Sequence, residues 1–257
     1  MARVHHLQSK LKTLKLGGML DSLELRLGQA EKDHLGYIEF LELLLEDEIQ
    51  RRANKSLQAR IAKAHFEEVK TLEEFNFSFN PKTPAQQIRD LGTCQFIERK
   101  ESVLICGPVG VGKTHIAQAL GHQACRLGYK VFFTKTSRLL ADLGGGRADG
   151  SWEVRLRRYL RFDLLIMDDF CLTPLNPQQA EDLYQLIEER YRRGSMVVTS
   201  NRAPEDWYDL FPNPVIAESA LDRLITCAHQ VVLTGRSYRP MLRPDRKSPV
   251  AEEVGTM

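Results

Sequence analysis

One stretch of the chain combines glycines, a lysine and a hydroxyl in a spacing that suits phosphate binding. It follows a short apolar segment and precedes a helical pattern, and it consists of Gly107, Pro108, Val109, Gly110, Val111, Gly112, Lys113 and Thr114. Glycine lets the backbone turn so that successive N–H groups face one concavity, next to the positive end of the following helix. The pattern predicts a nucleotide site in which Lys113 reaches the β- and γ-phosphates and Thr114 supplies a hydroxyl to Mg²⁺.

A pair of carboxylates follows an apolar segment further along the chain. Residues 164–167 predict a buried strand, and Asp168 and Asp169 come directly after it. Because ligands bind at the carboxyl ends of strands in open α/β sheets, we expect Asp168 to hold Mg²⁺ and Asp169 to act as general base or to orient the attacking water. The alternative is that two adjacent acids merely cap a strand in a turn.

A third strand end carries an amide. Residues 195–200 predict another apolar strand, and Asn201 follows it, where it could hydrogen-bond the attacking water or the γ-phosphate.

These residues require an α/β fold that brings several strand ends together. We predict a parallel sheet flanked by helices, with strands near residues 103–106, 130–134, 163–167, 195–200 and 229–233. Helices are expected at 137–143 and 177–193, and the glycines at 144–146 predict a flexible turn between elements.

The first 70 residues have a helical pattern and predict a small all-helical N-terminal domain. Its third helix is expected to bury one stripe, formed by Ile38, Leu41, Leu44, Leu45 and Ile49. Residues 71–99 predict a connector, in which Phe75, Phe77 and Phe79 alternate as in an extended segment and pack near the nucleotide. Residues 100–239 then form the nucleotide-binding domain, and 240–257 a disordered tail.

Composition sets the broad class of protein. A hydrophobic fraction of 42% and a charged fraction of 27% are typical of globular proteins, and five scattered cysteines favour neither disulfides nor a zinc site. No apolar run reaches the length of a membrane span, and the start lacks a signal-peptide core. We therefore expect a cytoplasmic protein with no membrane partner.

Basic residues gather in runs without acidic neighbours. No acid occurs between residues 51 and 66, and the basic residues there are Arg51, Arg52, Lys55, Arg60 and Lys63. Such a run cannot be neutralised by i,i+4 partners of its own, so it predicts contact with nucleic-acid phosphates, although a solvated helix face is the alternative. The lack of aromatic residues among these charges favours duplex over single-stranded DNA. A second candidate DNA-facing segment lies between residues 147 and 161 and includes Arg155 and Arg158.

The motifs, their order and their spacing resemble the AAA+ ATPases of the DnaC and IstB group, with a closer likeness to the IstB-like ATP-binding proteins of insertion-sequence transposons. The likeness rests on residues 14–16, 18–19, 48–52, 106–115, 168–170, 199–202, 221–224 and 235–239. It implies an ATPase with sites between subunits, completed by an arginine from the neighbouring copy. Arg223 is the candidate for that arginine, with a surface ion pair to Asp222 or Glu218 as the alternative, and Arg239 is a weaker candidate for sensing nucleotide.

The resemblance implies a helper of transposition that binds duplex DNA, assembles with ATP into a multimer and recruits or stimulates a transposase. Too little chain follows residue 232 for the helical lid of many AAA+ proteins. Aspartate at position 169, where many relatives carry glutamate, implies slow hydrolysis suited to a switch. Three alternatives remain open: a DnaC-like replicative helicase loader, a small-molecule kinase, and an architectural DNA-binding protein that uses ATP only for assembly.

Overall fold

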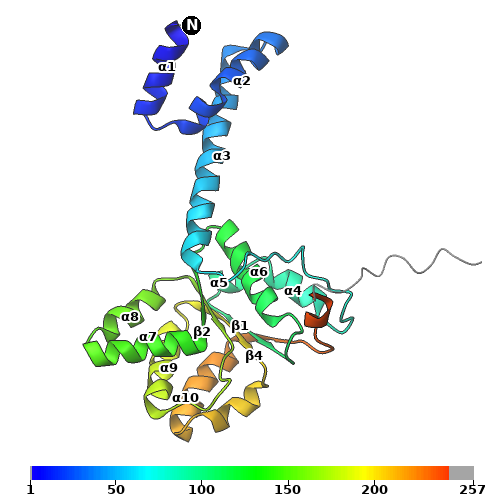
Figure 1. Cartoon of the computed structure of the whole chain (residues 1–257), viewed down its shortest axis with the longest axis vertical. Coiled ribbons are helices and arrows are strands. Elements are labelled where there is room, and N and C mark those ends of the chain that lie inside the picture. Colours follow the sequence, from blue (N-terminus) through cyan, green and yellow to red (C-terminus); the bar gives the residue numbers. More distant parts are fainter. Residues whose placement is uncertain (1, 243–257) are drawn as a thin grey trace, which may run out of the picture. The chain divides into compact units, whose positions relative to one another are not determined.

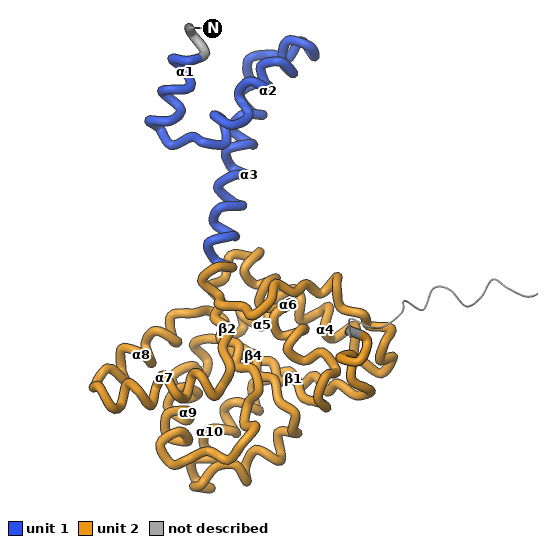
Figure 2. The backbone as a smooth tube through the Cα atoms, viewed as in Figure 1, with its two compact units in different colours: residues 1–60 blue, residues 61–257 orange. Residues whose placement is uncertain are grey.

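The computed structural model describes residues 2–242 and divides the chain into two compact units. The first unit is Met1–Arg60 and the second is Ile61–Met257 (Figure 2). The expected helical N-terminal domain of 1–70 and the boundaries of the connector are close to this division but do not coincide with it. The predicted disorder of the tail lies, from residue 243 onward, outside the described residues.

Three helices build the first unit: α1 (Ala2–Thr13), α2 (Gly17–Asp33) and α3 (Tyr37–Ala64) (Figure 1). Leu11, Met19, Leu23 and Leu44 form its buried cluster. Gly18 lets α2 approach α3 closely, because a Cβ at this position would lie 2.6 Å from the Cα of Glu48. The Gly18 amide donates to the carboxylate of Glu48 at 2.5 Å, which fixes the start of α2 against α3.

The predicted buried stripe of α3 is wrong for four of its five members. Leu44 is buried at 6% exposure, whereas the others are exposed: Ile38 at 75%, Leu41 at 52%, Leu45 at 45% and Ile49 at 59%. Helical periodicity identifies an apolar face but does not supply the element that covers it. With α1 and α2 as the other helices of this unit, the core reaches only the side of α3 that carries Leu44.

The second unit contains a five-stranded parallel sheet in the order β2-β3-β4-β1-β5. Its strands are β1 (Ser102–Cys106), β2 (Val131–Lys135), β3 (Leu164–Asp168), β4 (Ser195–Ser200) and β5 (Ala228–Val232). Its helices are α4 (Ala85–Leu91), α5 (Gln95–Glu98), α6 (Lys113–Arg126), α7 (Thr136–Asp149), α8 (Trp152–Leu160), α9 (Pro177–Arg190) and α10 (Pro214–Thr226), with 3-10 helices η1 (Pro204–Leu210) and η2 (Arg239–Leu242). The predicted parallel α/β sheet is therefore confirmed.

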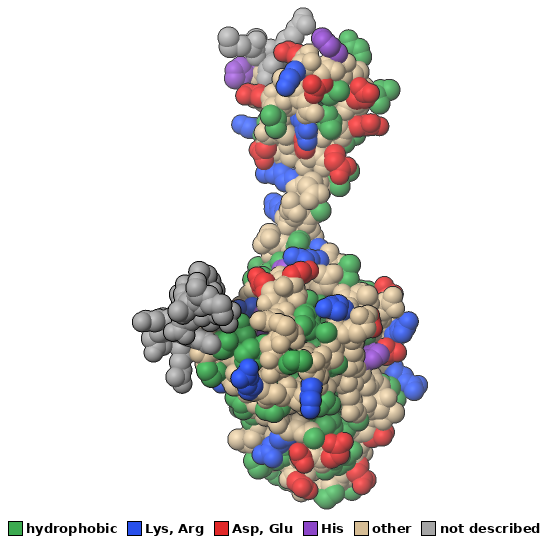
Figure 3. Space-filling view, turned by 90° about the vertical axis from the view of Figure 1, so that its right-hand side faces the viewer, with side chains coloured by type: hydrophobic (Ala, Val, Ile, Leu, Met, Phe, Trp, Pro, Cys, Tyr) green, Lys and Arg blue, Asp and Glu red, His purple; other side chains and the backbone are tan. Residues whose placement is uncertain are grey.

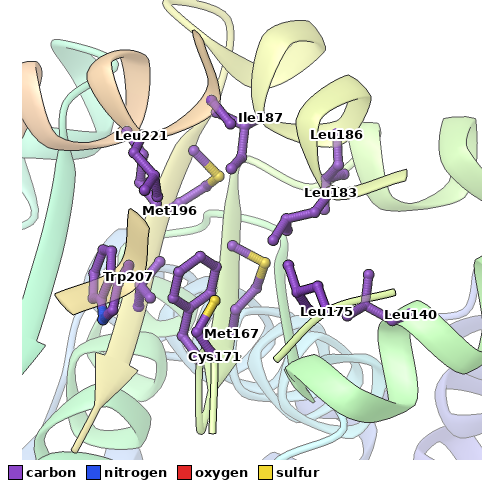
Figure 4. Packing of buried hydrophobic residues seen from close by; sticks show 14 of the residues in the cluster. Leu140, Met167, Cys171, Leu175, Leu183, Leu186, Ile187, Met196, Trp207 and Leu221 are labelled. Carbon is purple, nitrogen blue, oxygen red and sulfur yellow. The ribbon is translucent and has the colours of Figure 1, made fainter. Parts of the chain in front are cut away.

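Alternate residues of the central strands face opposite sides of the sheet. Met167 of β3 and Met196 of β4 enter a large cluster with Leu183 and Ile187 of α9 and with Trp207 of η1 (Figure 4). Helices α7, α8 and α10 also contribute to this cluster. Such burial on both faces explains why these strands read as continuous apolar runs.

The glycines at 144–146 do not form the predicted flexible turn, because α7 continues through them to Asp149. They lie where α8 packs closely against α7. A Cβ on Gly146 would lie 2.8 Å from the Cα of Trp152, and one on Gly145 would lie 2.9 Å from Nη1 of Arg155. Close helix packing, rather than flexibility, accounts for at least two of these glycines.

Residues 75–79 of the connector form turns rather than the predicted extended segment, and α4 and α5 lie in the second half of the connector. Backbone bonds of short span join its residues, including the bond from the amide of Phe77 to the carbonyl of Phe75. The predicted packing near the nucleotide loop is confirmed for Phe75, whose ring centroid lies 5.3 Å from that of His115 on α6. Among residues 2–242, no helix is both long and apolar enough to cross a lipid bilayer.

Candidate active site

Residues 107–114 join β1 to α6 and form the predicted glycine loop. Gly107, Gly110 and Gly112 have φ values of 150°, 81° and 103°, a region that other residues rarely adopt. Space is limiting as well, because a Cβ on Gly107 would overlap the carbonyl oxygen of Leu233. A Cβ on Gly112 would lie 2.5 Å from the Phe75 ring. The loop therefore requires glycine both for its conformation and for its contacts.

Lys113 is buried at 7% exposure at the start of α6, and its ammonium group is fully engaged within the site. Its Nζ donates to the carbonyls of Gly107 at 2.8 Å and Pro108 at 2.7 Å, and to Oδ1 of Asn201 at 2.6 Å. Burial lowers the pKa of Lys113, while the nearby Asp169 and Asp168 carboxylates oppose that shift. The structure thus brings together the two predicted phosphate-contacting side chains, Lys113 and Asn201.

Asp168 ends β3 and lies between two hydroxyl groups. Its Oδ1 accepts from Thr114 at 2.9 Å and from Thr199 of β4 at 2.5 Å. Burial raises the pKa of Asp168, although both hydroxyl bonds act in the opposite direction. A carboxylate beside a hydroxyl offers the hard oxygen ligands that Mg²⁺ prefers, so the donor set fits the expected metal. Thr114 and Asp168, predicted as metal-binding residues, are direct neighbours.

Asp169 follows with a left-handed backbone, at a φ of 57°. Its amide donates to Oγ1 of Thr199 at 3.1 Å, so this hydroxyl is bonded to both acidic residues. The Asp169 carboxylate is about one-third exposed, and its Oδ2 lies 3.6 Å from Nζ of Lys135. The carboxylate predicted to act on water is therefore accessible, and a basic group lies beside it.

The structure also shows contacts that sequence reasoning missed. Thr199 lies within the predicted apolar strand 195–200, and in the structure its side chain bridges Asp168 and Asp169. The segment after β5 lies over the glycine loop, since the amide of Tyr238 donates to the carbonyl of Gly110 at 2.8 Å. Arg239 acts on Lys113 electrostatically and contributes to its lowered pKa, which places this arginine near the loop. Polar residues at strand ends could have identified Thr199, whereas the return of the chain to Gly110 has no local signal.

Arg223 lies on α10, and no contact joins it to the glycine loop among the described residues. Its Nη1 donates to the carbonyl of Ser219 at 2.5 Å, and its guanidinium lies 5.9 Å from the centroid of the Tyr184 ring. The alternative of an ion pair with Asp222 or Glu218 finds no support in the ion pairs of residues 2–242. The role of Arg223 in a neighbouring subunit remains a prediction.

The first basic run is partly neutralised, which corrects the expectation that it lacks partners. Arg51 Nε lies 3.2 Å from Asp21, and Arg52 Nε donates at 2.6 Å to Glu48, four residues earlier on the same helix. The acidic partner Glu48 lies on α3 just before the basic run, and α2 supplies the second acidic partner, Asp21. Lys55 and Lys63 are exposed with no ion pair within residues 2–242, and Arg60 donates to Ser56 at 2.7 Å.

The second basic segment is occupied by intramolecular ion pairs. Arg155 contacts Asp142 at 3.2 Å and Asp149 at 2.5 Å, and Arg158 contacts Asp142 at 2.6 Å. These ion pairs join α8 to α7. The two arginines therefore stabilise the packing of these helices and are not an unpaired DNA-facing patch. On the face shown in Figure 3, basic and acidic side chains are interspersed in both units.

Comparisons with known proteins show which family the chain resembles along most of its length. A family model described as IstB-like ATP binding protein matches residues 9–247. The chain is 52% identical to Rv3427c of Mycobacterium tuberculosis, described as an ATP-binding protein in an insertion sequence, over 93% of this chain and 96% of that protein. It is 36% identical to the ATP-binding protein of insertion sequence IS21 from Pseudomonas aeruginosa, over 96% of this chain and 92% of that one.

The likeness to solved structures concerns the fold. The crystal structure of the DnaC helicase loader has a TM-score of 0.51 at 22% identity and covers 58% of this chain and 88% of its own. It supports the fold, a parallel sheet flanked by helices.

Proposed function

Because the chain belongs to the IstB-like ATP-binding family, we propose that it is an ATP-hydrolysing helper of transposition. In this role it binds duplex DNA, assembles with ATP and Mg²⁺ into a multimer, and recruits or stimulates a transposase. The observation that carries the proposal is the match along residues 9–247, since it includes the N-terminal helices as well as the ATP site.

The site residues divide the chemistry of hydrolysis among them. The glycine-loop amides and Lys113 bind the phosphates, for which Lys113 exchanges its present carbonyl partners. Thr114 and Asp168 would hold Mg²⁺, which neutralises charge on the phosphates when bound. Asp169 orients or deprotonates the attacking water, and Asn201 fixes the water or the γ-phosphate. Arg223 supplies charge to the site of the neighbouring subunit.

Two variants separate ATP binding from hydrolysis. Lys113→Ala is expected to abolish binding of a fluorescent ATP analogue and, with it, assembly. Asp169→Asn keeps the side-chain size and should retain binding while phosphate release stops. Hydrolysis by Asp169→Asn at the wild-type rate would disprove the role of this carboxylate. Failure of Asp169→Asn to assemble with ATP would show that hydrolysis, rather than binding, drives assembly.

Sedimentation with nucleotide and DNA tests the remaining parts of the proposal. Wild-type protein with ATP should form large assemblies on duplex DNA and not on single strands of equal length. Lys55→Gln combined with Lys63→Gln should weaken this binding and reduce its dependence on salt, because these exposed lysines lack ion pairs in the described chain. Assembly on single strands alone would favour the helicase-loader alternative.

A further inference from the structure

A cavity of about 590 Å³ lies within the second unit, between α4, α6 and the start of the connector (Figure 1). Its volume falls in the range of roughly 300–1,000 Å³ that is common for small-molecule sites. Its lining includes Phe75 and Phe77 of the connector, Arg89 of α4, and His122, Gln123 and Arg126 of α6. The residues of α6 belong to the end of that helix that is remote from the glycine loop. The cavity is therefore separate from the phosphate-binding part of the ATP site.

One wall of this cavity is aromatic and carries a cation. The rings of Phe75 and Phe77 pack edge to face, with centroids 4.8 Å apart. The guanidinium of Arg89 lies 5.2 Å from the centroid of the Phe77 ring, and Arg89 has no ion pair within residues 2–242. Nucleic-acid bases stack both on phenyl rings and on guanidinium planes. This wall therefore offers a flat surface to a planar base.

A second cation stands at the opposite wall. Arg126 is 44% exposed, and Glu73 is its one ion-pair partner in the described part of the chain, with Nη1 and Oε1 4.0 Å apart. Glu73 is itself 74% exposed, and ion pairs of such exposed groups are weak. The guanidinium of Arg126 is therefore available to an anion, and its planar fork of donors suits the oxygens of a phosphate.

Two further side chains supply neutral hydrogen-bonding groups. His122 is buried at 7% exposure, yet no hydrogen bond joins its ring to another group among residues 2–242. Burial lowers the pKa of His122, and the charge of Arg126 acts in the same direction, so the ring is neutral at physiological pH. A neutral imidazole has one donor and one acceptor, and the amide of Gln123 has both as well. The polar edge of a nucleobase presents the complementary groups.

We propose that this cavity is a second ligand site, and that its ligand is a nucleotide. The base stacks on Phe77 and Arg89, its edge bonds to His122 and Gln123, and its phosphate binds Arg126. The nucleotide is either free or part of a DNA strand, because both present the same base and phosphate. The inference goes beyond the proposed function and does not depend on it, since it requires neither hydrolysis nor a transposase.

Phe75 connects this cavity with the ATP site. A Cβ on Gly112 of the glycine loop would lie 2.5 Å from Cε2 of Phe75, and the Phe75 ring also packs against His115. The same ring lines the cavity. The two sites therefore share one side chain, and the test must keep the ATP site filled so that the probe reports on the cavity alone.

The test uses the fluorescent base 2-aminopurine, whose emission is quenched when it stacks. The full chain is first saturated with a non-hydrolysable ATP analogue and Mg²⁺. It is then titrated with 2-aminopurine deoxyribonucleoside monophosphate, or with an oligonucleotide that carries this base at its end. Quenching by the mononucleotide indicates a free nucleotide as ligand, and quenching of the oligonucleotide alone indicates DNA.

Variants of the lining show whether the probe occupies the cavity. Phe77→Leu should weaken binding about tenfold, because it removes the stacking surface, and Phe77→Tyr should restore it. Arg126→Gln should weaken binding about fivefold and reduce its dependence on salt. Lys82→Gln removes an exposed cation of the connector outside the cavity lining and should have no effect.

Urea unfolding and binding of the ATP analogue, measured on each variant, separate loss of the cavity from loss of the fold. The inference requires Phe77→Leu and Arg126→Gln to bind the probe more weakly while both of these properties are retained. It would be overturned if neither probe were quenched by the wild type. Equal affinities of the wild type, Phe77→Leu and Arg126→Gln for the quenched probe would also overturn it, because stacking would then occur elsewhere.

Discussion

The hydroxyl of Thr199 donates to Oδ1 of Asp168 at 2.5 Å and accepts from the amide of Asp169 at 3.1 Å. One side chain on β4 therefore fixes both the carboxylate expected to hold Mg²⁺ and the backbone of the residue expected to act on water. Thr199 acts on the site through Asp168 and Asp169, and removal of its hydroxyl should change the positions of both residues.

Thr199→Val tests this arrangement with a side chain of nearly the same shape. The buried Asp168 loses one of its two hydroxyl donors, so the free energy of unfolding should fall by about 1–3 kcal/mol. Phosphate release should fall more than ATP binding does, because the acidic residues are displaced while the glycine loop is intact. Urea unfolding and phosphate-release assays measure the two effects. Thr199→Ser, which keeps the hydroxyl, serves as the control, and equal losses in both variants would contradict the prediction.

The raised pKa of Asp168 predicts that its charge costs stability in the metal-free protein. Burial favours the protonated form, so the folded state binds this proton more tightly than the unfolded state does. The contribution of this group is therefore favourable at low pH and is lost as the pH rises through its raised pKa. An asparagine side chain at this position cannot ionise and can still accept from both hydroxyls.

We expect Asp168→Asn, in a chelating buffer at neutral pH, to have a higher free energy of unfolding than the wild type. The difference should shrink as the pH is lowered toward the ordinary range of an aspartate. Urea titrations across this range measure it, and the same variant should lose Mg²⁺-dependent hydrolysis. If the wild-type protein were more stable than the variant at neutral pH, the hydrogen bonds to Asp168 would outweigh the cost of burying its charge.

The interior of the second unit depends on Arg190, which is buried at 1% exposure. Nη1 donates to the carbonyls of Tyr159 and Phe162, and Nη2 donates to that of Ser195 at 2.6 Å. Burial lowers the pKa of this guanidinium to about 10.

Arg190→Met should reduce the free energy of unfolding by about 3 kcal/mol or more, because it leaves several buried carbonyls without donors. Thermal and urea unfolding would measure the loss. Arg193→Met, which removes an exposed arginine one turn later, provides the comparison and should change stability little. A similar effect of the two substitutions would argue against a structural role for the buried network.

Local sequence was sufficient for the parts of the site that depend on local conformation. The glycine loop requires positive φ values at Gly107, Gly110 and Gly112, and this requirement is visible in the residue types themselves. Asp168 and Asn201 were placed by the rule that strand ends of a parallel sheet meet at one edge. Nζ of Lys113 and Oδ1 of Asn201 lie 2.6 Å apart, as that rule predicts.

Features that depend on packing between distant segments were not predictable in the same way. The contact of Lys135 with Asp169 requires the register of β2 against β3, which no local pattern encodes. The glycines at 144–146 have a low intrinsic helix propensity, yet α7 continues through them, and Gly145 and Gly146 lie in close contact with α8. The apolar residues along one face of α3 are visible in the sequence. Whether another element covers that face is not, and most of these side chains are exposed in the structure.

The proposed role of Arg223 requires a neighbouring subunit. Arg223→Ala should bind the fluorescent ATP analogue with wild-type affinity, because no described contact joins Arg223 to its own glycine loop. Its phosphate release should fall by at least about tenfold, since an arginine that stabilises charge in the transition state acts on kcat.

Mixing two inactive variants distinguishes action in trans from action within one chain. Asp169→Asn subunits retain Arg223, and Arg223→Ala subunits retain Asp169, so a mixed assembly contains some interfaces at which both groups are present. Phosphate release should therefore rise above that of either variant alone, toward about one-quarter of the wild-type rate if subunits mix at random in equal amounts. Tyr184→Leu, which removes the ring beside Arg223, should give a smaller loss than Arg223→Ala. Absence of any recovery in the mixture, with assembly confirmed by sedimentation, would exclude Arg223 as the arginine supplied to the neighbouring site.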